Sequence, residues 1–282
     1  MSEWPTKDVR GVTLKADPAR EPIFEVVDTD AEMEEYDDFS DVSRRERLHR
    51  HMNNECVAME IAAQAVADYP EAPWGLRMKL ARQAADESRH VAVLYRRLKE
   101  LDGRKGEFPV ANFEWGVTMM VDDLPGRLAI ENRTFEAGLI DILGQLRTKW
   151  RKEGDDRTAD SLEGILADEI THVRFANRWI KRLTEEDPRV LLNVAKAIYF
   201  LRQVSERLDP KEGEVNRVGM VFSEERVQAP AVDVHGRLEA GFTEDEVLVV
   251  LEQAGFRSIL PSGDRQKLET LKAAAREREA ES

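Results

Sequence analysis

The sequence predicts an all-α protein whose main body is a bundle of four long helices, followed by additional helices toward the C-terminus. Three observations predict it. Apolar residues recur at helical spacing from residue 43 to about 183, glycine and proline fall mainly in the gaps between these stretches, and no alternating strand pattern competes. The gaps are short, long and short in turn, which indicates two antiparallel hairpins joined by a long crossover between the second and third helices.

Residues 1–42 are expected to form an acidic N-terminal arm outside this bundle. The first 40 residues carry 12 acids and 4 bases, and residues 28–38 hold 7 acids and no base. Such a stretch is typical of a solvated or loosely attached segment, because repelling charges oppose packing into an apolar core. Within it, the apolar residues Phe24, Val26 and Val27 are expected to dock as a short extended piece.

The bundle itself is predicted over residues 43–184. Its helices are expected over residues 43–68, 74–101 and 125–153, and from the turn at 154–156 to about 183. The second helix is about 40 Å long at about 1.5 Å per residue. The connection between the second and third helices has more than twenty residues, and twenty extended residues reach about 65 Å. This connection can therefore make the crossover.

Residues 185–282 are predicted to form a C-terminal helical extension packed on the bundle. Asp187-Pro188 begins a fifth helix that runs through about residue 208, and residues 210–232 look irregular. Thr243 and Glu246 have the spacing of a capping box, which opens a helix ending at Gly255. The mixed-charge residues 264–281 are expected to form a surface helix.

Charge and composition exclude several classes of protein. The chain has 42 basic and 56 acidic residues, a net charge of −14, which argues against a nucleic-acid partner or an anionic membrane surface. No apolar run reaches about 18 residues, so no membrane span is expected. The first residues lack the pattern of a signal peptide, which predicts a cytoplasmic protein. The single cysteine, Cys56, excludes an internal disulfide and a thiolate metal cluster.

Two of the five histidines lie in the same frame, Asp86-Glu87-Ser88-Arg89-His90 and Asp168-Glu169-Ile170-Thr171-His172. A glutamate and a histidine three residues apart share one face of a helix, and in both helices that face is the apolar stripe. An unpaired buried carboxylate is costly, but a metal ion makes several buried carboxylates favourable together. The stripes therefore predict a metal site.

The first helix offers Glu55 or Glu60 as a further ligand, and the distance to the turn decides between them. The turn is centred near Glu71; Glu55 lies 16 residues before it and Glu87 lies 16 after it, so these two are level. Glu60 lies only 11 residues before the turn and about 140° around the helix from Glu55. We therefore predict Glu55 as the ligand.

The third helix offers Glu131 or Glu136, and the same reasoning selects Glu136. Glu136 lies 18 or 19 residues before the second turn, whereas Glu169 and His172 follow that turn by 14 to 18 residues. Glu131 lies farther from the turn and, in an α-helix, about 140° off the ligand face. Glu60 and Glu131 are both expected to support the site from outside or to lie on the surface.

The selected set holds four carboxylates and two imidazoles from four helices: Glu55, Glu87, His90, Glu136, Glu169 and His172. These donors suit a dinuclear site for two iron ions, with a manganese and iron pair as the alternative. Each histidine also needs its second nitrogen oriented. Because Asp86 and Asp168 point toward the neighbouring helices, we expect crossed contacts from Asp86 to His172 and from Asp168 to His90. The histidines at positions 49, 51 and 235 fit no site that the sequence suggests.

These residues resemble the ferritin-like di-iron carboxylate superfamily. A wider set resembles an uncharacterised bacterial ferritin-like family catalogued as a domain of unknown function, and this resemblance covers nearly the whole chain. Its motifs are Asn54-Glu55, Asp86-Glu87-Ser88-Arg89-His90, Phe113-Glu114-Trp115, Thr134-Phe135-Glu136, Asp168-Glu169-Ile170-Thr171-His172-Val173 and Gly236-Arg237-x-x-Ala240-Gly241-Phe242. The resemblance implies a bundle with a di-iron site between the helices. It brings no agreed substrate, because the superfamily includes oxygenases, oxidases, ferroxidases, peroxidases and a tRNA hydroxylase.

The main functional hypothesis is a di-iron enzyme that uses O2 to oxidise a small organic substrate. Its electron donor is not identified by the sequence, and a homodimer is compatible with it. A ferroxidase or storage protein is the alternative, ranked lower because the arm and about 95 C-terminal residues would obstruct packing into a hollow cage. A tRNA hydroxylase is less favoured because the net charge is −14, although Arg44, Arg45, Arg47 and Arg50 offer a local basic patch. A metal-free interaction module would leave six buried polar groups unexplained.

Overall fold

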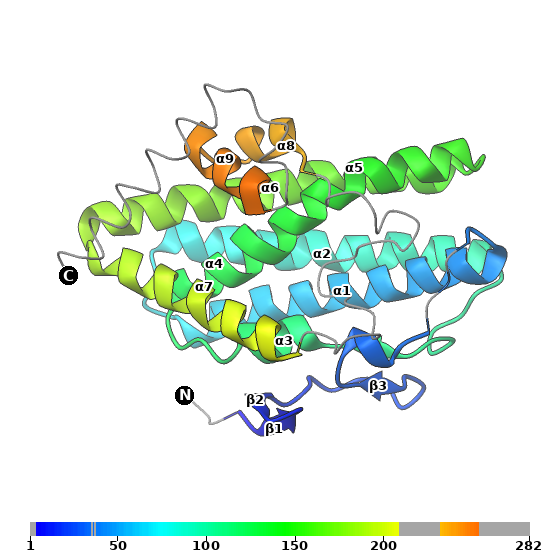
Figure 1. Cartoon of the computed structure of the whole chain (residues 1–282), viewed down its shortest axis with the longest axis horizontal. Helices are drawn as coiled ribbons and strands as arrows, with labels where there is room; N and C mark the ends of the chain where they lie inside the picture. Colours follow the sequence, from blue (N-terminus) through cyan, green and yellow to red (C-terminus); the bar gives the residue numbers. More distant parts are fainter. Residues whose placement is uncertain (1–3, 35, 37, 209–231, 254–282) are drawn as a thin grey trace.

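The computed structural model describes residues 4–34, 36, 38–208 and 232–253, and this part of the chain is built mainly from helices (Figure 1). The predicted all-α class is confirmed. Three short strands lie near the N-terminus and a fourth lies in the crossover. The predicted irregular stretch beyond residue 208, the predicted helix end at Gly255 and the predicted helix over 264–281 lie outside the described residues, apart from position 232.

The bundle consists of two hairpins of long helices. In the first hairpin, α1 (Asp41–Asp68) packs along α2 (Trp74–Glu100). The second joins a composite helix to α6 (Asp156–Glu186); the composite helix runs through α4 (Leu124–Ile130), a π-helical turn (Glu131–Glu136) and α5 (Ala137–Lys152). The hairpins meet where α2 contacts α6 (Figure 1). The four long helices were predicted to within about three residues, but the π-helical turn was not.

Side-chain caps fix where these helices begin. Ser40 accepts a hydrogen bond from the amide of Ser43 at the start of α1, and Asp123 accepts one from Gly126 at the start of α4. Asp155 caps α6 through the amide of Thr158. These contacts satisfy amides that have no partner within the helix. The preceding residue, Gly154, has a φ of +82°, a left-handed conformation that glycine adopts without strain, and this lets the chain reverse between α5 and α6.

The crossover carries structure of its own. It contains the two-residue strand β4 (Val110–Ala111) and the short helix α3 (Phe113–Thr118). The strand β3 (Val26–Val27) pairs with β4 in parallel, with Val26 opposite Val110 and Val27 opposite Ala111. The predicted docking of an extended piece at Val26 and Val27 is therefore confirmed.

The rest of the N-terminal segment is also packed against the helices. Strands β1 (Thr6–Val9) and β2 (Val12–Lys15) form an antiparallel hairpin. Leu14 of β2 points from this hairpin toward the helices and is fully buried. The indole nitrogens of Trp4 and Trp115 both donate to the carbonyl oxygen of Ala16, at 3.1 and 3.0 Å. The prediction of a solvated or loosely attached arm is therefore wrong for this part, because its few apolar residues fill a place over α3.

The C-terminal helices pack against the second hairpin at two places. Helix α7 (Arg189–Leu208) packs on α4 and α6, while α8 (Val234–Glu239) packs on α5 and α6 (Figure 1). A short helix, α9 (Glu244–Gln253), follows and contacts α8. The predicted capping box is confirmed: the amide of Thr243 donates to Glu246 Oε2 at 2.8 Å, and the amide of Glu246 donates to Thr243 Oγ1 at 3.2 Å.

Two apolar clusters fill the bundle and leave a polar belt between them. Toward one end, the long helices contribute Met52, Leu94, Leu143 and Ile165. Toward the other end, they contribute Ala65, Leu80, Leu128 and Ala176. The middle of each long helix therefore lies between two apolar layers. Among the described residues, no helix combines the length and apolar character needed to cross a membrane.

Candidate metal centre

All six predicted ligand residues lie in the polar belt, and each is at most 3% exposed. Glu55 comes from α1, Glu87 and His90 from α2, Glu136 from the π-helical turn, and Glu169 and His172 from α6. They occupy positions where the buried stripe of each helix continues, so the packing that buries the neighbouring leucines also brings these polar groups inside.

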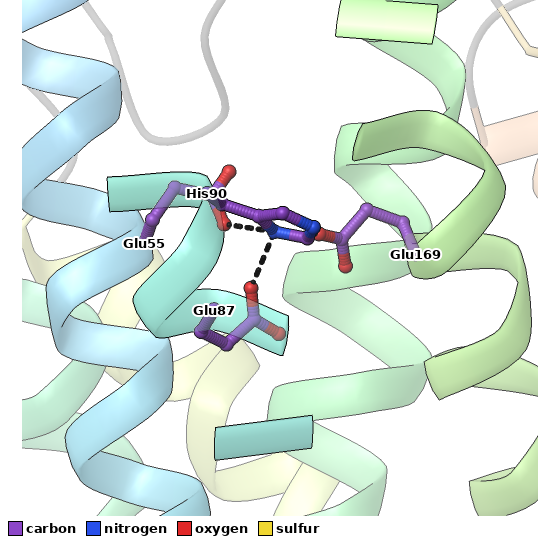
Figure 2. A group of neighbouring side chains, drawn as sticks. All are labelled: Glu55, Glu87, His90 and Glu169. Atoms are coloured by element: carbon purple, nitrogen blue, oxygen red, sulfur yellow. Dashed lines mark hydrogen bonds and ion pairs between the residues drawn. The ribbon is translucent and has the colours of Figure 1, made fainter. Parts of the chain in front are cut away.

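Glu55, Glu87, His90 and Glu169 form the first of two groups (Figure 2). Nδ1 of His90 lies 2.8 Å from Glu87 Oε2, 3.0 Å from Glu55 Oε2 and 3.4 Å from Glu169 Oε1. The one hydrogen that this nitrogen can carry cannot serve three acceptors at once. The convergence of these lone pairs on one point is the arrangement that a bound cation would satisfy.

Glu87, Glu136, Glu169 and His172 form the second group. Nδ1 of His172 lies 3.0 Å from Glu87 Oε1, 3.4 Å from Glu169 Oε2 and 3.8 Å from Glu136 Oε1. Within each group, one donor atom from every residue lies within 4.8 Å of the others. The second group therefore repeats the first, with Glu136 and His172 in place of Glu55 and His90. Glu55 and Glu136, which each belong to one group only, are called the terminal glutamates.

The two groups share Glu87 and Glu169. In each of these two glutamates, one carboxylate oxygen faces His90 and the other faces His172. This is the arrangement of a carboxylate that bridges two cations. The oxygens Glu87 Oε1 and Glu169 Oε1 are buried and accept no aligned hydrogen bond, although a histidine nitrogen lies 3.0 and 3.4 Å from them. Buried oxygens without donors are costly, so the residues present fit a metal pair. Oxygen and imidazole donors of this kind suit iron or manganese.

Both predicted pairs of aspartate and histidine lie close together, but only Asp168 and His90 meet in hydrogen-bond geometry, whereas Asp86 and His172 lie at an ion-pair distance. Oδ2 of Asp168 lies 3.2 Å from Nε2 of His90, and Oδ2 of Asp86 lies 3.5 Å from Nε2 of His172. Each histidine therefore turns Nδ1 toward the glutamates and Nε2 toward an aspartate of the other hairpin. A carboxylate that accepts from the second ring nitrogen fixes the orientation of a ligand histidine.

The electrostatics of the cluster follow from burying acids beside histidines. Burial raises the pKa of Glu87 and of Glu136, and neighbouring carboxylates raise them further. Burial opposes the charged form of Glu55 too, but hydrogen bonds from His51 and His90 lower its pKa to about 2. The pKa of His90 and of His172 is raised despite burial, because both rings face carboxylates. Protons on the histidines thus take the place of cations in the metal-free protein.

The sequence did not predict the groups that hold the two terminal glutamates. Nε2 of His51 lies 2.6 Å from Glu55 Oε1, so the prediction that His51 fits no site is wrong. At the other end, Glu136 accepts hydrogen bonds from the amides of Gln83 and Asn132, the latter at 2.7 Å. The available signal was spacing: His51 precedes Glu55 by one helical turn, and Gln83 precedes Glu87 by one turn within the buried stripe.

Glu131 and Glu60 differ in their places. Glu60 forms an ion pair with Arg20 at 2.7 Å and lies away from the ligand cluster, as predicted. Glu131 is only 2% exposed and supports the site from outside the ligand set, which is one of its two predicted places; the other, a place on the surface, is wrong. That prediction assumed an α-helix, whereas in a π-helical turn residues five apart are hydrogen-bonding neighbours and face the same side.

Glu131 lies close enough to Glu114 of α3 for each carboxyl group to influence the pKa of the other. Burial raises the pKa of both carboxyl groups, and the surrounding glutamates add to this effect. Two carboxyl groups in contact share a proton more easily than they carry two charges. The pair therefore holds a proton beside the ligand cluster.

The chain belongs to the family described as "Protein of unknown function (DUF455)", whose model matches residues 2–248. A curated relative, an uncharacterized protein of Haemophilus influenzae, is 30% identical over 106 residues, which is 37% of this chain and 37% of the relative. The match thus spans little more than a third of that relative's length. No solved structure matches the chain.

Proposed function

We propose that this member of the DUF455 family is a ferritin-like di-iron enzyme that uses O2 to oxidise a small organic substrate. The observation that carries the proposal is the pair of ligand groups that share Glu87 and Glu169. Four helices supply four glutamates and two histidines, the donor set that carboxylate-bridged iron pairs take from a bundle. Bound iron would supply the redox steps that the reduction of O2 requires.

The residues of the chain would hold and shield the metal pair. Glu55 and His90 would bind one ion, Glu136 and His172 the other, and the shared glutamates would bridge them. The donors on His51, Gln83 and Asn132 fix the terminal glutamates, which limits their movement. The apolar clusters on both sides exclude water from the belt. Glu114 and Glu131, whose carboxyl groups have raised pKa values, would hold a proton beside the redox chemistry that bound iron would supply.

Oxygen uptake tests this proposal. The anaerobic protein, loaded with two equivalents of Fe(II), is mixed with O2 and followed by absorbance and by an oxygen electrode. We expect rapid uptake by the wild type and by the control Glu163→Gln, whose side chain lies 55% exposed on α6. We expect at least a tenfold slower reaction for Glu136→Gln, which removes one terminal carboxylate. Uptake at wild-type rate by Glu136→Gln would refute the assignment.

The same assay separates the enzyme from a ferroxidase. A ferroxidase continues to consume O2 when many further equivalents of Fe(II) are added, because iron is its substrate. The proposed enzyme stops after the resident pair is oxidised and resumes when a reductant and an organic substrate are supplied. Continuous turnover with Fe(II) alone would favour iron handling over the proposed oxidation of an organic substrate.

A further inference from the structure

The side chain of Arg89 joins the two motifs on the outer side of the ligand cluster. It belongs to α2, between Glu87 and His90, and its side chain is 51% exposed. Its Nη2 lies 2.8 Å from Asp86 Oδ1 on the same helix and 2.9 Å from Asp168 Oδ2 on α6. A single guanidinium nitrogen therefore contacts both aspartates that orient the histidines.

Those two aspartates lie beside the outer nitrogens of both rings. Asp168 lies against Nε2 of His90 and Asp86 lies against Nε2 of His172, at 3.2 and 3.5 Å. An imidazole is rigid, so fixing Nε2 also determines where Nδ1 points. A shift of Arg89 would remove an arginine contact from both aspartates at once, leaving Asp86 with Arg82 alone, and would loosen the aim of both histidines toward the glutamates.

The second motif has no equivalent of Arg89. Its corresponding residue is Thr171, whose hydroxyl donates to the carbonyl oxygen of Ala167 at 3.2 Å. A second arginine, Arg82, donates from Nε to Asp86 Oδ2 at 2.7 Å and forms no ion pair with Asp168 within the described part of the chain. Arg89 thus contacts the aspartates of both motifs, whereas Arg82 contacts the aspartate of the first motif.

We propose that Arg89 is a positioning residue that couples the two metal positions by holding Asp86 and Asp168 together. The inference rests on the proposed metal centre but not on its oxidase chemistry. Because the arginine is half exposed, its contacts are screened by salt. The position of both histidines should then depend on ionic strength in the wild type.

Anaerobic titration with Co(II) tests the coupling without any activity assay, because the visible absorption of Co(II) reports the geometry of its ligands. Loss of a residue that directly holds a ligand weakens metal binding by about 10- to 100-fold, so for Arg89, one contact further away, we expect about 3- to 10-fold. Arg89→Ala should weaken both equivalents and change the absorption of both. Arg89→Lys should restore part of the affinity, since a lysine keeps the charge but not the planar fork.

Two variants give matched controls. Arg82→Ala should affect the equivalent bound at His172, and Asp168→Asn should affect the equivalent bound at His90. Raising NaCl from 50 to 500 mM should weaken Co(II) binding in the wild type more than in Arg89→Ala. Thermal melts of the metal-free variants check that each one is folded.

The outcomes separate the two proposals. If the wild type binds two Co(II) ions and Arg89→Ala binds them with unchanged affinity and spectrum, the coupling is refuted while the metal centre stands. The same conclusion follows if Arg82→Ala disturbs both equivalents as strongly as Arg89→Ala does. If the wild type binds no Co(II), the metal centre itself is refuted, and the role of Arg89 falls with it.

Discussion

Four glutamates and two histidines in one dry belt pose a charge problem that has two solutions. Two divalent cations balance four carboxylates and leave both imidazoles neutral. Without cations, bound protons must balance the negative charge of the carboxylates. The raised pKa values of His90 and His172 indicate that these two rings carry such protons. Metal ions and protons therefore compete for the same residues, which makes metal affinity dependent on pH.

This competition predicts an unusual pH dependence for the metal-free protein. A histidine whose pKa is raised by folding contributes stability below its ordinary value of 6.5, and that contribution is lost as the pH rises toward the folded pKa. The raised pKa values of Glu87 and Glu136 act in the same direction. Each extra proton held by the folded state lowers the free energy of unfolding by about 1.4 kcal/mol per pH unit.

Thermal melts of chelator-treated and metal-loaded protein between pH 6 and pH 9 check this expectation. The melting temperature of the metal-free form should fall steadily over this range, while that of the loaded form should change much less. His172→Gln, which holds one proton fewer, should give the metal-free form a shallower slope. Parallel curves for the loaded and metal-free proteins would contradict the account.

At the scale of elements, the short helix α8 is held to the bundle by a buried ion pair. Nε of Arg237 lies 2.9 Å from Asp141 Oδ1 on α5, and the guanidinium stacks over Phe242 at 5.2 Å from the ring centre. Burial raises the pKa of Asp141, although Arg237 works against this. The following helix α9 reaches the π-helical turn through an ion pair between Arg133 and Glu246. The C-terminal helices thus brace the segment that carries Glu136.

Arg237→Met should therefore destabilise the protein by about 3 to 5 kcal/mol, because it leaves the Asp141 carboxylate buried without a partner. Chemical denaturation measures the loss, and hydrogen exchange should show α8 opening first. The double variant Asp141→Leu/Arg237→Met removes both charges and should recover most of the stability. A single variant as stable as the wild type would show that α8 is held by its apolar contacts alone.

The helices of the bundle could be predicted from the sequence, but one irregular turn within them could not. Periodicity and turns predicted the four long helices because each has an apolar stripe at helical spacing, and counting residues from the turns placed the six ligand residues together. The π-helical turn could not be predicted in this way, because it changes the number of residues per turn only over the six residues Glu131–Glu136. The contact of Arg89 with Asp168 could not be predicted from sequence spacing either, because Asp168 belongs to the other hairpin.

At the scale of the whole molecule, the acidic composition of residues 1–40 led to a wrong prediction of how much of this segment is packed. Residues 1–40 carry 12 acids, yet Arg20 from this segment reaches Asn53, Glu60 and Asn112. A few such contacts, together with Leu14, anchor a segment whose overall composition resembles a solvated tail. Composition averages over a segment, whereas docking depends on single residues, so this part of the fold could not be predicted from charge.

The most direct test of the central claim is the number of metal ions that the protein binds under anaerobic conditions. After loading with Fe(II) and desalting, elemental analysis should find about two ions per chain in the wild type and in the exposed control Glu163→Gln. Glu55→Gln and Glu136→Gln should each retain about one, and Glu87→Gln, which loses a shared carboxylate, should retain less than one. A wild type without bound metal, or a Glu87→Gln protein that still binds two ions, would contradict the account.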